Sequence, residues 1–191
     1  TGADITVDRT LGVLTGALIL DTAVVDVNGD FTQTGGSVTA PNTFTLSGTW
    51  LRAGGTFDHN TGSVVLDGAS QTLSGSTRFY SLTKVVTTAQ TLTFAAGQTQ
   101  SVSGTLTLNG AAGNRLSLRS DVTDTAALLT LSGASAAQNL LYLDVKDSDA
   151  SDGVQLDCLV GCLNSGNATN WNFADGAGTI IGKVYGLSLI H

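Results

Sequence analysis

The side chains best suited to acid–base chemistry gather between residues 115 and 157. All fifteen acidic residues of the chain are aspartates, so carboxylate chemistry here cannot use Glu. The candidates are Asp144, Asp147, Asp149, Asp152 and Asp157, beside Lys146, Arg115 and Arg119. Cleavage of a polysaccharide needs a paired acid and base, or a basic residue assisted by calcium, on one face of the protein. We expect instead that these aspartates lie in a solvated turn and that the chain has no catalytic residues.

Calcium is the strongest rival interpretation of the loop from Asp147 to Asp152. Its Asp-x-Asp start is similar to an EF-hand loop, but the register fails. The third ligand position is Ser151, the glycine comes one residue late at Gly153, and Cys158 stands at the twelfth position, where a bidentate Glu belongs. We therefore assign no metal ligands and no cofactor, and a looser calcium site in this loop stays an alternative.

The two cysteines, Cys158 and Cys162, are close together in the sequence. A local disulfide would suit an exported protein, and two unpaired buried thiols are equally compatible with the spacing. A zinc site would need two further ligands, and His59 and His191 are remote in sequence. The disulfide requires the turn to bring the two Cα atoms within about 7 Å.

Translational repetition is the strongest signal for the elements that carry these residues. The segment 29–38 returns as 48–57, with the aromatic residue, the paired glycines and the next apolar position in the same places. The segment 43–48 is answered in the same way by 63–68. A period of about twenty residues with short alternating strands and glycine corners is typical of a solenoid coil.

The predicted fold class is therefore all-β: a right-handed parallel β-helix, or β-solenoid, with coils of about 20 residues or more and almost no helix. Stacked coils would place Phe31 over Trp50 and Val38 over Phe57. A sandwich of antiparallel hairpins is the alternative, but a sandwich needs no such self-similarity. The expected strands contain the apolar runs Phe44/Leu46, Val64/Leu66, Leu92/Phe94, Leu106/Leu108, Leu116/Leu118, Leu129/Leu131 and Leu141/Leu143/Val145.

A second recurring element is the tripeptide Leu46-Ser-Gly48. It returns at Leu73, Val102 and Leu131, with nearly even separations that are longer than the period of the first repeat. These separations imply either a loop inserted in each coil, such as 76–80, or a larger coil past residue 70.

Composition and charge restrict the partners. A net charge of −7 with only eight basic residues, none clustered, leaves nothing to neutralise a nucleic acid or an anionic lipid surface. The most apolar run, Leu11 to Leu20, is half the length of about 20 residues that a bilayer span needs. We predict no nucleic acid partner, no membrane insertion, and one or two buried strands in that run.

The repeats resemble the β-helical repeat region of large bacterial surface proteins, adhesin-like and autotransporter-like in character. The resemblance covers about residues 28–173 and is carried by 31–66, by Gln71 to Thr83, by Thr91 to Phe94 and by Gly104 to Leu108. It implies a solenoid over residues 1–173 that serves as an extracellular scaffold. Residues 174–191 would then be a linker and the start of a following module, ending in Leu187 to His191, which resembles a translated sequencing adapter.

The function expected from these features is a non-catalytic structural or adhesion scaffold of an exported cell-surface protein. Its partners would be surface glycans or neighbouring domains of the same long chain, bound through strand faces or through the loops 78–81 and 147–152. A carbohydrate-active β-helix enzyme is one alternative, although the signature motifs of pectinase-like enzymes are absent. Trp171 and Phe173 are expected to fold back over the last coil as a cap.

An ice-binding or crystal-surface-binding solenoid is the other alternative. Its flat face would carry Thr-x-Thr pairs in register on successive coils. The chain has the spacing, but one coil after Thr43 and Thr45 stand Ser63 and Val65, which interrupt the register. The pairs in question are Thr32/Thr34, Thr43/Thr45, Thr91/Thr93 and Thr105/Thr107.

Overall fold

The computed structural model describes residues 4–21 and 24–174. Within these ranges every regular element is a β-strand, and the strands form five sheets. Sheet 1 contains β1 (Ile5–Val7), β4 (Val24–Val27), β7 (Thr43–Leu46), β10 (Ser63–Leu66), β13 (Ser81–Val85), β16 (Thr105–Asn109) and β19 (Ala137–Leu141). Sheet 2 contains β2 (Leu11–Val13), β5 (Phe31–Gln33), β8 (Trp50–Arg52), β11 (Gln71–Ser74), β14 (Gln90–Phe94), β17 (Leu116–Ser120), β20 (Leu143–Val145) and β23 (Leu163–Asn164).

The third side of the molecule is divided between three smaller sheets. Sheet 3 contains β12 (Thr77–Phe79), β15 (Thr99–Val102), β18 (Ala127–Leu131), β21 (Ser148–Asp149) and β24 (Ala168–Thr169). Sheet 4 contains β3 (Ala17–Ile19), β6 (Ser37–Thr39) and β9 (Thr56–Asp58). Sheet 5 pairs β22 (Leu156–Cys158) with β25 (Trp171–Phe173).

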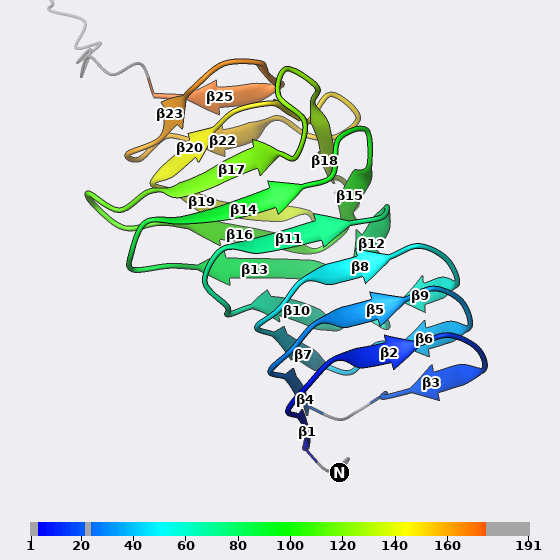
Figure 1. The fold of residues 1–191 in the computed structure, drawn as a ribbon. Coiled ribbons are helices and arrows are strands. Elements are labelled where there is room, and N and C mark those ends of the chain that lie inside the picture. Colours follow the sequence, from blue (N-terminus) through cyan, green and yellow to red (C-terminus); the bar gives the residue numbers. More distant parts are fainter. Residues whose placement is uncertain (1–3, 22–23, 175–191) are drawn as a thin grey trace, which may run out of the picture.

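The chain is a parallel β-solenoid, as the repeats predict. Within each sheet a strand pairs in parallel with the strand one coil later, so neighbours in a sheet are separated by two strands of other sheets. In Figure 1 the strands of sheet 2 point to the right across the front, and those of sheet 1 point to the left behind them as the stack rises. This is the right-handed sense expected for parallel crossovers.

The two stacking pairs expected from the repeat are both present. Phe31 pairs with Trp50 in sheet 2, with ring centroids 4.3 Å apart, and both side chains are buried. Val38 pairs with Phe57 in sheet 4. Trp50 also contacts Phe44, so the first coils share an aromatic core.

The paired glycines of the repeat form stacked corners. Gly36 and Gly55 have φ angles of +62° and +75°, a region that disfavours side chains. A Cβ added to Gly55 would lie 2.4 Å from the carbonyl oxygen of Gly35 in the coil before. Close coil stacking at this corner therefore requires glycine, which explains why the pair returns in the sequence.

Coil length changes along the stack. Phe44 pairs with Val64, whereas Leu106 pairs with Gln138, a separation in sequence that is more than half as long again. The larger coils predicted past residue 70 are thus confirmed. The predicted inserted loop at 76–80 is wrong, because these residues contain β12 and begin sheet 3.

The even separations of the Leu-Ser-Gly tripeptide suggested that it occupies the same position in successive coils. The structure shows that it does not. Leu46 lies in sheet 1, Leu73 lies in sheet 2, and Val102 and Leu131 lie in sheet 3. Only the last two are partners one coil apart. The tripeptide follows a strand end on three different faces, and a local corner preference therefore produced an apparent period.

Two strand predictions were also wrong in detail. Leu141, Leu143 and Val145 were expected on one strand, but Tyr142 has a φ of +51° and ends β19 before β20 begins. The run from Leu11 to Leu20 forms two strands, as predicted. It is not buried throughout, because Leu14 and Ile19 keep 68% and 70% of their surface exposed.

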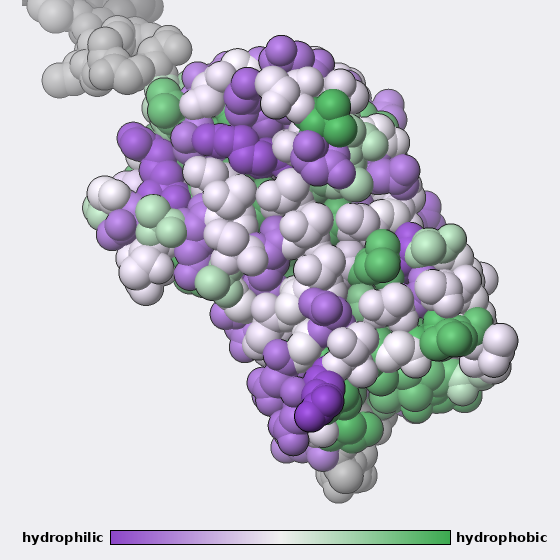
Figure 2. Space-filling model, in the orientation of Figure 1, coloured by the Kyte–Doolittle hydropathy of each residue, from purple (hydrophilic) through white to green (hydrophobic). Residues whose placement is uncertain are grey.

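The two ends of the solenoid differ in the hydropathy of their surface. Figure 2 shows apolar surface gathered over the first coils at the lower right, and mostly hydrophilic surface over the last coils at the top. Trp171 does not fold back over the last coil as a cap. It lies within that coil, pairs with Leu156, and is 8% exposed. Most of the predicted linker and following module, from residue 175 onward, lies outside the described residues.

Candidate functional site

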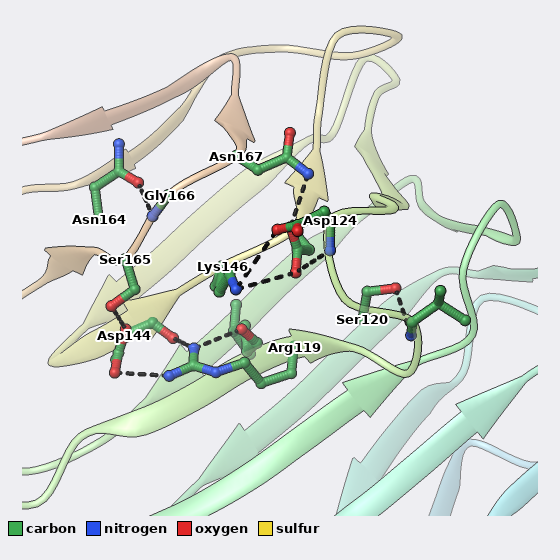
Figure 3. Close-up of polar contacts among 12 residues, drawn as sticks. Arg119, Ser120, Asp124, Asp144, Lys146, Asn164, Ser165, Gly166 and Asn167 are labelled. Carbon is green, nitrogen blue, oxygen red and sulfur yellow. Dashed lines mark hydrogen bonds and ion pairs between the residues drawn. The ribbon is translucent and has the colours of Figure 1, made fainter.

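The first polar cluster joins β17 to β20 on the outer face of sheet 2. Arg119 forms an ion pair with Asp144, with 2.7 Å between Nη2 and Oδ2. Its Nη1 donates to the main-chain oxygens of Leu118 and Asp144, and Ser165 donates its hydroxyl to the other carboxylate oxygen of Asp144. Figure 3 shows Arg119 and Ser165 on two sides of Asp144. Both carboxylate oxygens therefore have protein partners.

These partners set the protonation state of Asp144. Burial works to raise the pKa of this carboxyl group, but hydrogen bonds from Arg119 and Ser165, with the charges of Arg119 and Arg115, outweigh burial and lower the pKa below its ordinary value. Asp144 is consequently ionised at neutral pH. A general acid needs the opposite shift.

The second cluster surrounds Asp147 at the corner after β20. Asp147 is 3% exposed, and its φ of +56° turns the chain from sheet 2 into sheet 3. Asn167 donates its side-chain amide to one carboxylate oxygen at 2.7 Å, and the backbone N–H of Asp124 donates to the other at 3.1 Å. Lys146 lies 3.7 Å from the carboxylate of Asp124 and 3.9 Å from that of Asp147.

The hydrogen bond from Asn167 is the main cause of a lowered pKa at Asp147, and the backbone N–H of Asp124 and the charge of Lys146 act in the same direction. The cluster thus holds an ionised carboxylate between fixed donors. Its geometry supports a structural role, because Asp147 accepts hydrogen bonds from Asp124 in the preceding coil and from Asn167 in the next.

The remaining predicted residues are dispersed. Asp149 accepts hydrogen bonds from the backbone and the hydroxyl of Ser151 within its own turn. Asp157 accepts from the side chain of Asn172, and Arg115 donates to the main-chain oxygen of Gly161. Among the described residues no group of three or more His, Cys or Asp side chains has the geometry to hold a metal ion.

Cys158 and Cys162 form a disulfide, with Cα atoms 5.8 Å apart. This decides between the alternatives that the sequence left open for the two cysteines. The bridge closes the turn after β22, where Leu159 and Val160 are half exposed. The disulfide therefore holds an apolar turn against the last coils.

The threonine pairs lie on two different faces. Thr43/Thr45 and Thr105/Thr107 belong to sheet 1, whereas Thr91/Thr93 belong to sheet 2. In sheet 1, Thr45 pairs with Val65, so the interruption predicted from the sequence is present. The pairs do not form one continuous array of hydroxyl groups.

A groove on sheet 3 brings together the two segments expected to bind a partner, 78–81 and 147–152. The first is not the loop that was expected, because Arg78 lies in β12 and Ser81 begins β13. The groove has a volume of about 420 Å³, and Arg78 and Asp152, one from each segment, both line it. Arg78 pairs in register with Ser101, and Ser101 pairs with Thr130, so three successive coils contribute to one outward column. The groove is lined by Arg78, Thr99, Ser101, Val102, Ser103, Thr130, Ser132, Gly133 and Asp152. We call it the axial groove.

One buried ionisable residue was missed by the sequence reasoning. Lys84 is fully buried, and its Nζ donates to the main-chain oxygens of Gly68 and Ala69, each at 2.9 Å, and to Oε1 of Gln71 at 2.6 Å. Burial lowers the pKa of Lys84 to about 8, although the charge of Asp67 acts to raise it. The lysine ties the corner between β10 and β11 to the next coil.

Alternation could have revealed this position. Leu82 is an inward residue of β13, so Lys84, the next residue but one on the same strand, also points inward. The residue type, which is rarely buried, hid the pattern.

None of the comparisons with known proteins gives a match, whether with family models, curated proteins or solved structures. In the part of the chain that the structure describes, there is no helical segment with the length and apolar character of a membrane span.

Proposed function

We propose that this chain is a non-catalytic structural and adhesion scaffold segment of a large exported bacterial cell-surface protein. The observation that carries the proposal is the solenoid itself, in which each coil stacks in parallel on the next from Ile5 to Phe173. Such stacks are rigid along one axis and present long side-chain columns, which suits spacing or adhesion.

The disulfide supports the extracellular location. Bridges of this kind persist in oxidising compartments and are rare where thiols are kept reduced. The Cys158–Cys162 bridge closes a short turn near the last coils, in which Cys158 is buried and Cys162 is partly exposed.

The state of the carboxylates supports a non-catalytic role. Asp144 and Asp147 both have lowered pKa values and accept hydrogen bonds from neighbouring coils. Polysaccharide hydrolysis needs a carboxyl group that is protonated at the working pH and a second group that is free to act as base or nucleophile. Asp144 and Asp147 instead link neighbouring coils through these hydrogen bonds.

Labelling of intact cells tests the location. Antibodies raised against the folded segment are expected to bind producing cells without permeabilisation. In addition, protein taken from these cells should react with a maleimide only after reduction. Labelling that requires permeabilisation, or two thiols that react at once, would contradict the proposal.

A polysaccharide panel tests the absence of catalysis. We expect no release of reducing sugar or unsaturated product from plant, algal or bacterial polysaccharides. Release that is abolished by Asp144→Asn or Asp147→Asn would establish the carbohydrate-active enzyme instead.

A further inference from the structure

The two charged residues of the axial groove differ from the charged residues around them. Within residues 24–174, Arg52, Arg115 and Arg119 each donate hydrogen bonds to other parts of the chain. The side chains of Arg78 and Asp152 have no hydrogen-bond or ion-pair partner among the described residues. Their charges face solvent in the groove, so they are available to a ligand.

The groove separates these charges along the solenoid axis. Arg78 lies on β12, and Asp152 follows β21, which is three coils further along sheet 3. Three strand spacings of about 4.8 Å give a separation of about 14 Å. The floor between them is lined by Ser101 and by Thr130, which is 8% exposed, with Val102 as the apolar lining residue. An elongated hydrophilic ligand fits this arrangement better than a compact apolar one.

We propose that the axial groove binds a short oligosaccharide that carries one carboxylate sugar, with the carboxylate at Arg78 and a pair of adjacent hydroxyls at Asp152. A guanidinium group binds a carboxylate through two parallel hydrogen bonds. An ionised Asp accepts hydrogen bonds from two hydroxyl donors, and Ser and Thr both donate and accept. The proposal rests on the adhesion role proposed above and specifies its ligand.

Two observations exclude other ligand classes. The net charge of −7 repels a polyanion, so a single acidic sugar among neutral ones is favoured over a polyuronate. The floor strands β15 and β18 have neighbours on both sides in sheet 3, so their backbone groups are not open to strand addition by a peptide.

Titration calorimetry tests the proposal on the folded segment. The probes are a trisaccharide with one glucuronic acid unit and the matched trisaccharide with glucose in its place. We expect the acidic probe to bind at least tenfold more tightly, with an affinity that falls as salt is added. Arg78→Gln should remove that preference, and Asp152→Asn should weaken both probes. Arg9→Gln, an exposed arginine on the first coil, is the matched control and should change neither.

Equal binding of the two probes, or an unchanged preference in Arg78→Gln, would overturn the proposal. So would the absence of binding by a segment that is folded by circular dichroism. If intact cells are nevertheless labelled, the scaffold function stands and only the ligand is wrong. If cells are labelled only after permeabilisation, the scaffold function itself fails.

Discussion

The early coils, from Ile5 to Leu66, and the late coils, from Leu116 to Phe173, share one architecture but are held together differently. In the early coils, partners in successive strands keep nearly the same separation in sequence throughout. In the late coils this separation is uneven and shortens toward the end, where Leu156 already pairs with Trp171. Apolar side chains stack in both regions, as Phe31 does with Trp50 and Leu118 with Val145, but the further links between coils differ.

Aromatic contacts hold the early coils. Trp50 lies 4.3 Å from Phe31, 5.1 Å from Phe57 and 5.2 Å from Phe79, measured between ring centroids. Stacked and edge-to-face pairs of this kind add to the gain from burial. A few large aromatic side chains therefore contribute much of the free energy of unfolding of these coils.

Polar side chains hold the late coils. Asn167 donates to Asp147, Asn170 donates to the main-chain oxygen of Ala150, and Asn172 donates to Asp157, each one coil back. The disulfide adds a covalent link in the same region. The late coils keep buried apolar pairs, such as Leu118 with Val145, so the directional bonds and the disulfide are added to the apolar column there. The comparison teaches that a solenoid can vary its coil length where such links supplement the stacked apolar side chains.

Replacing Trp50 should have the largest effect on stability. Trp50→Ala removes a fully buried ring and leaves Thr77 without the indole donor, so we expect a loss of about 3–5 kcal/mol in urea unfolding. Trp171→Ala is the matched control, because its indole also donates to a hydroxyl, that of Ser148. Its loss should be smaller, since Trp171 is at the end of the described stack. Equal losses would contradict the contrast between the two regions.

Lys84 lies between the two regions, and its removal should have the next largest effect. Lys84→Met leaves two main-chain oxygens and the side-chain oxygen of Gln71 without a donor, which should cost about 2–3 kcal/mol at pH 7. A variant as stable as the original protein would show that the buried lysine does not link these coils.

The pH dependence sharpens this prediction. The pKa of Lys84 is about 8 in the folded protein, against an ordinary value of 10.5, so between these values the unfolded chain binds more protons. The free energy of unfolding should therefore rise as the pH increases from about 8 toward 10. Lys84→Met should abolish the rise, whereas Lys146→Met, at a partly exposed lysine, should keep it.

Removing the disulfide should have the third largest effect on stability. Replacing both Cys158 and Cys162 by Ser opens a short loop, for which chain entropy predicts a loss of about 2 kcal/mol. Thermal unfolding of the variant should show an earlier transition confined to the late coils. A variant with an unchanged profile would mean that the asparagine contacts suffice there.

Asp144 should have the smallest effect. Asp144→Asn weakens a partly exposed ion pair, so we expect a loss of about 1 kcal/mol at pH 7. Because the folded pKa is lowered, this contribution is complete above about pH 4 and disappears as the pH falls through the folded value. The variant should consequently lose less stability in acid. Asp152→Asn, which breaks no contact, should follow the original acid profile.

The early coils were the part of the fold that sequence could predict. Phe31, Trp50 and the glycine pairs recur at one spacing, and stacking requires that recurrence. The late coils were less predictable, because Arg119 and Asp144 meet only once the whole coil between them is folded. For the same reason the sequence did not decide whether Cys158 and Cys162 are bonded, since their spacing alone does not determine the conformation of the turn.

The axial groove was predicted from the sequence only in part. Sequence indicated the segments 78–81 and 147–152 separately as binding elements, but not that Arg78 lies on a strand or that Arg78 and Asp152 line one groove. Their approach depends on the lengths of the coils between them, which no local pattern encodes. Lys84, by contrast, was predictable from alternation with Leu82 and was missed because of its charge.

Hydrogen exchange of two variants tests most directly the claim that one solenoid contains two separately stabilised regions. Because each coil contacts only its neighbours, Trp50→Ala should accelerate exchange in β2, β5 and β8 and leave β22 and β25 protected. The double Cys158→Ser, Cys162→Ser variant should do the reverse. Uniform acceleration over the whole chain in either variant would contradict the account and show a single cooperative unit.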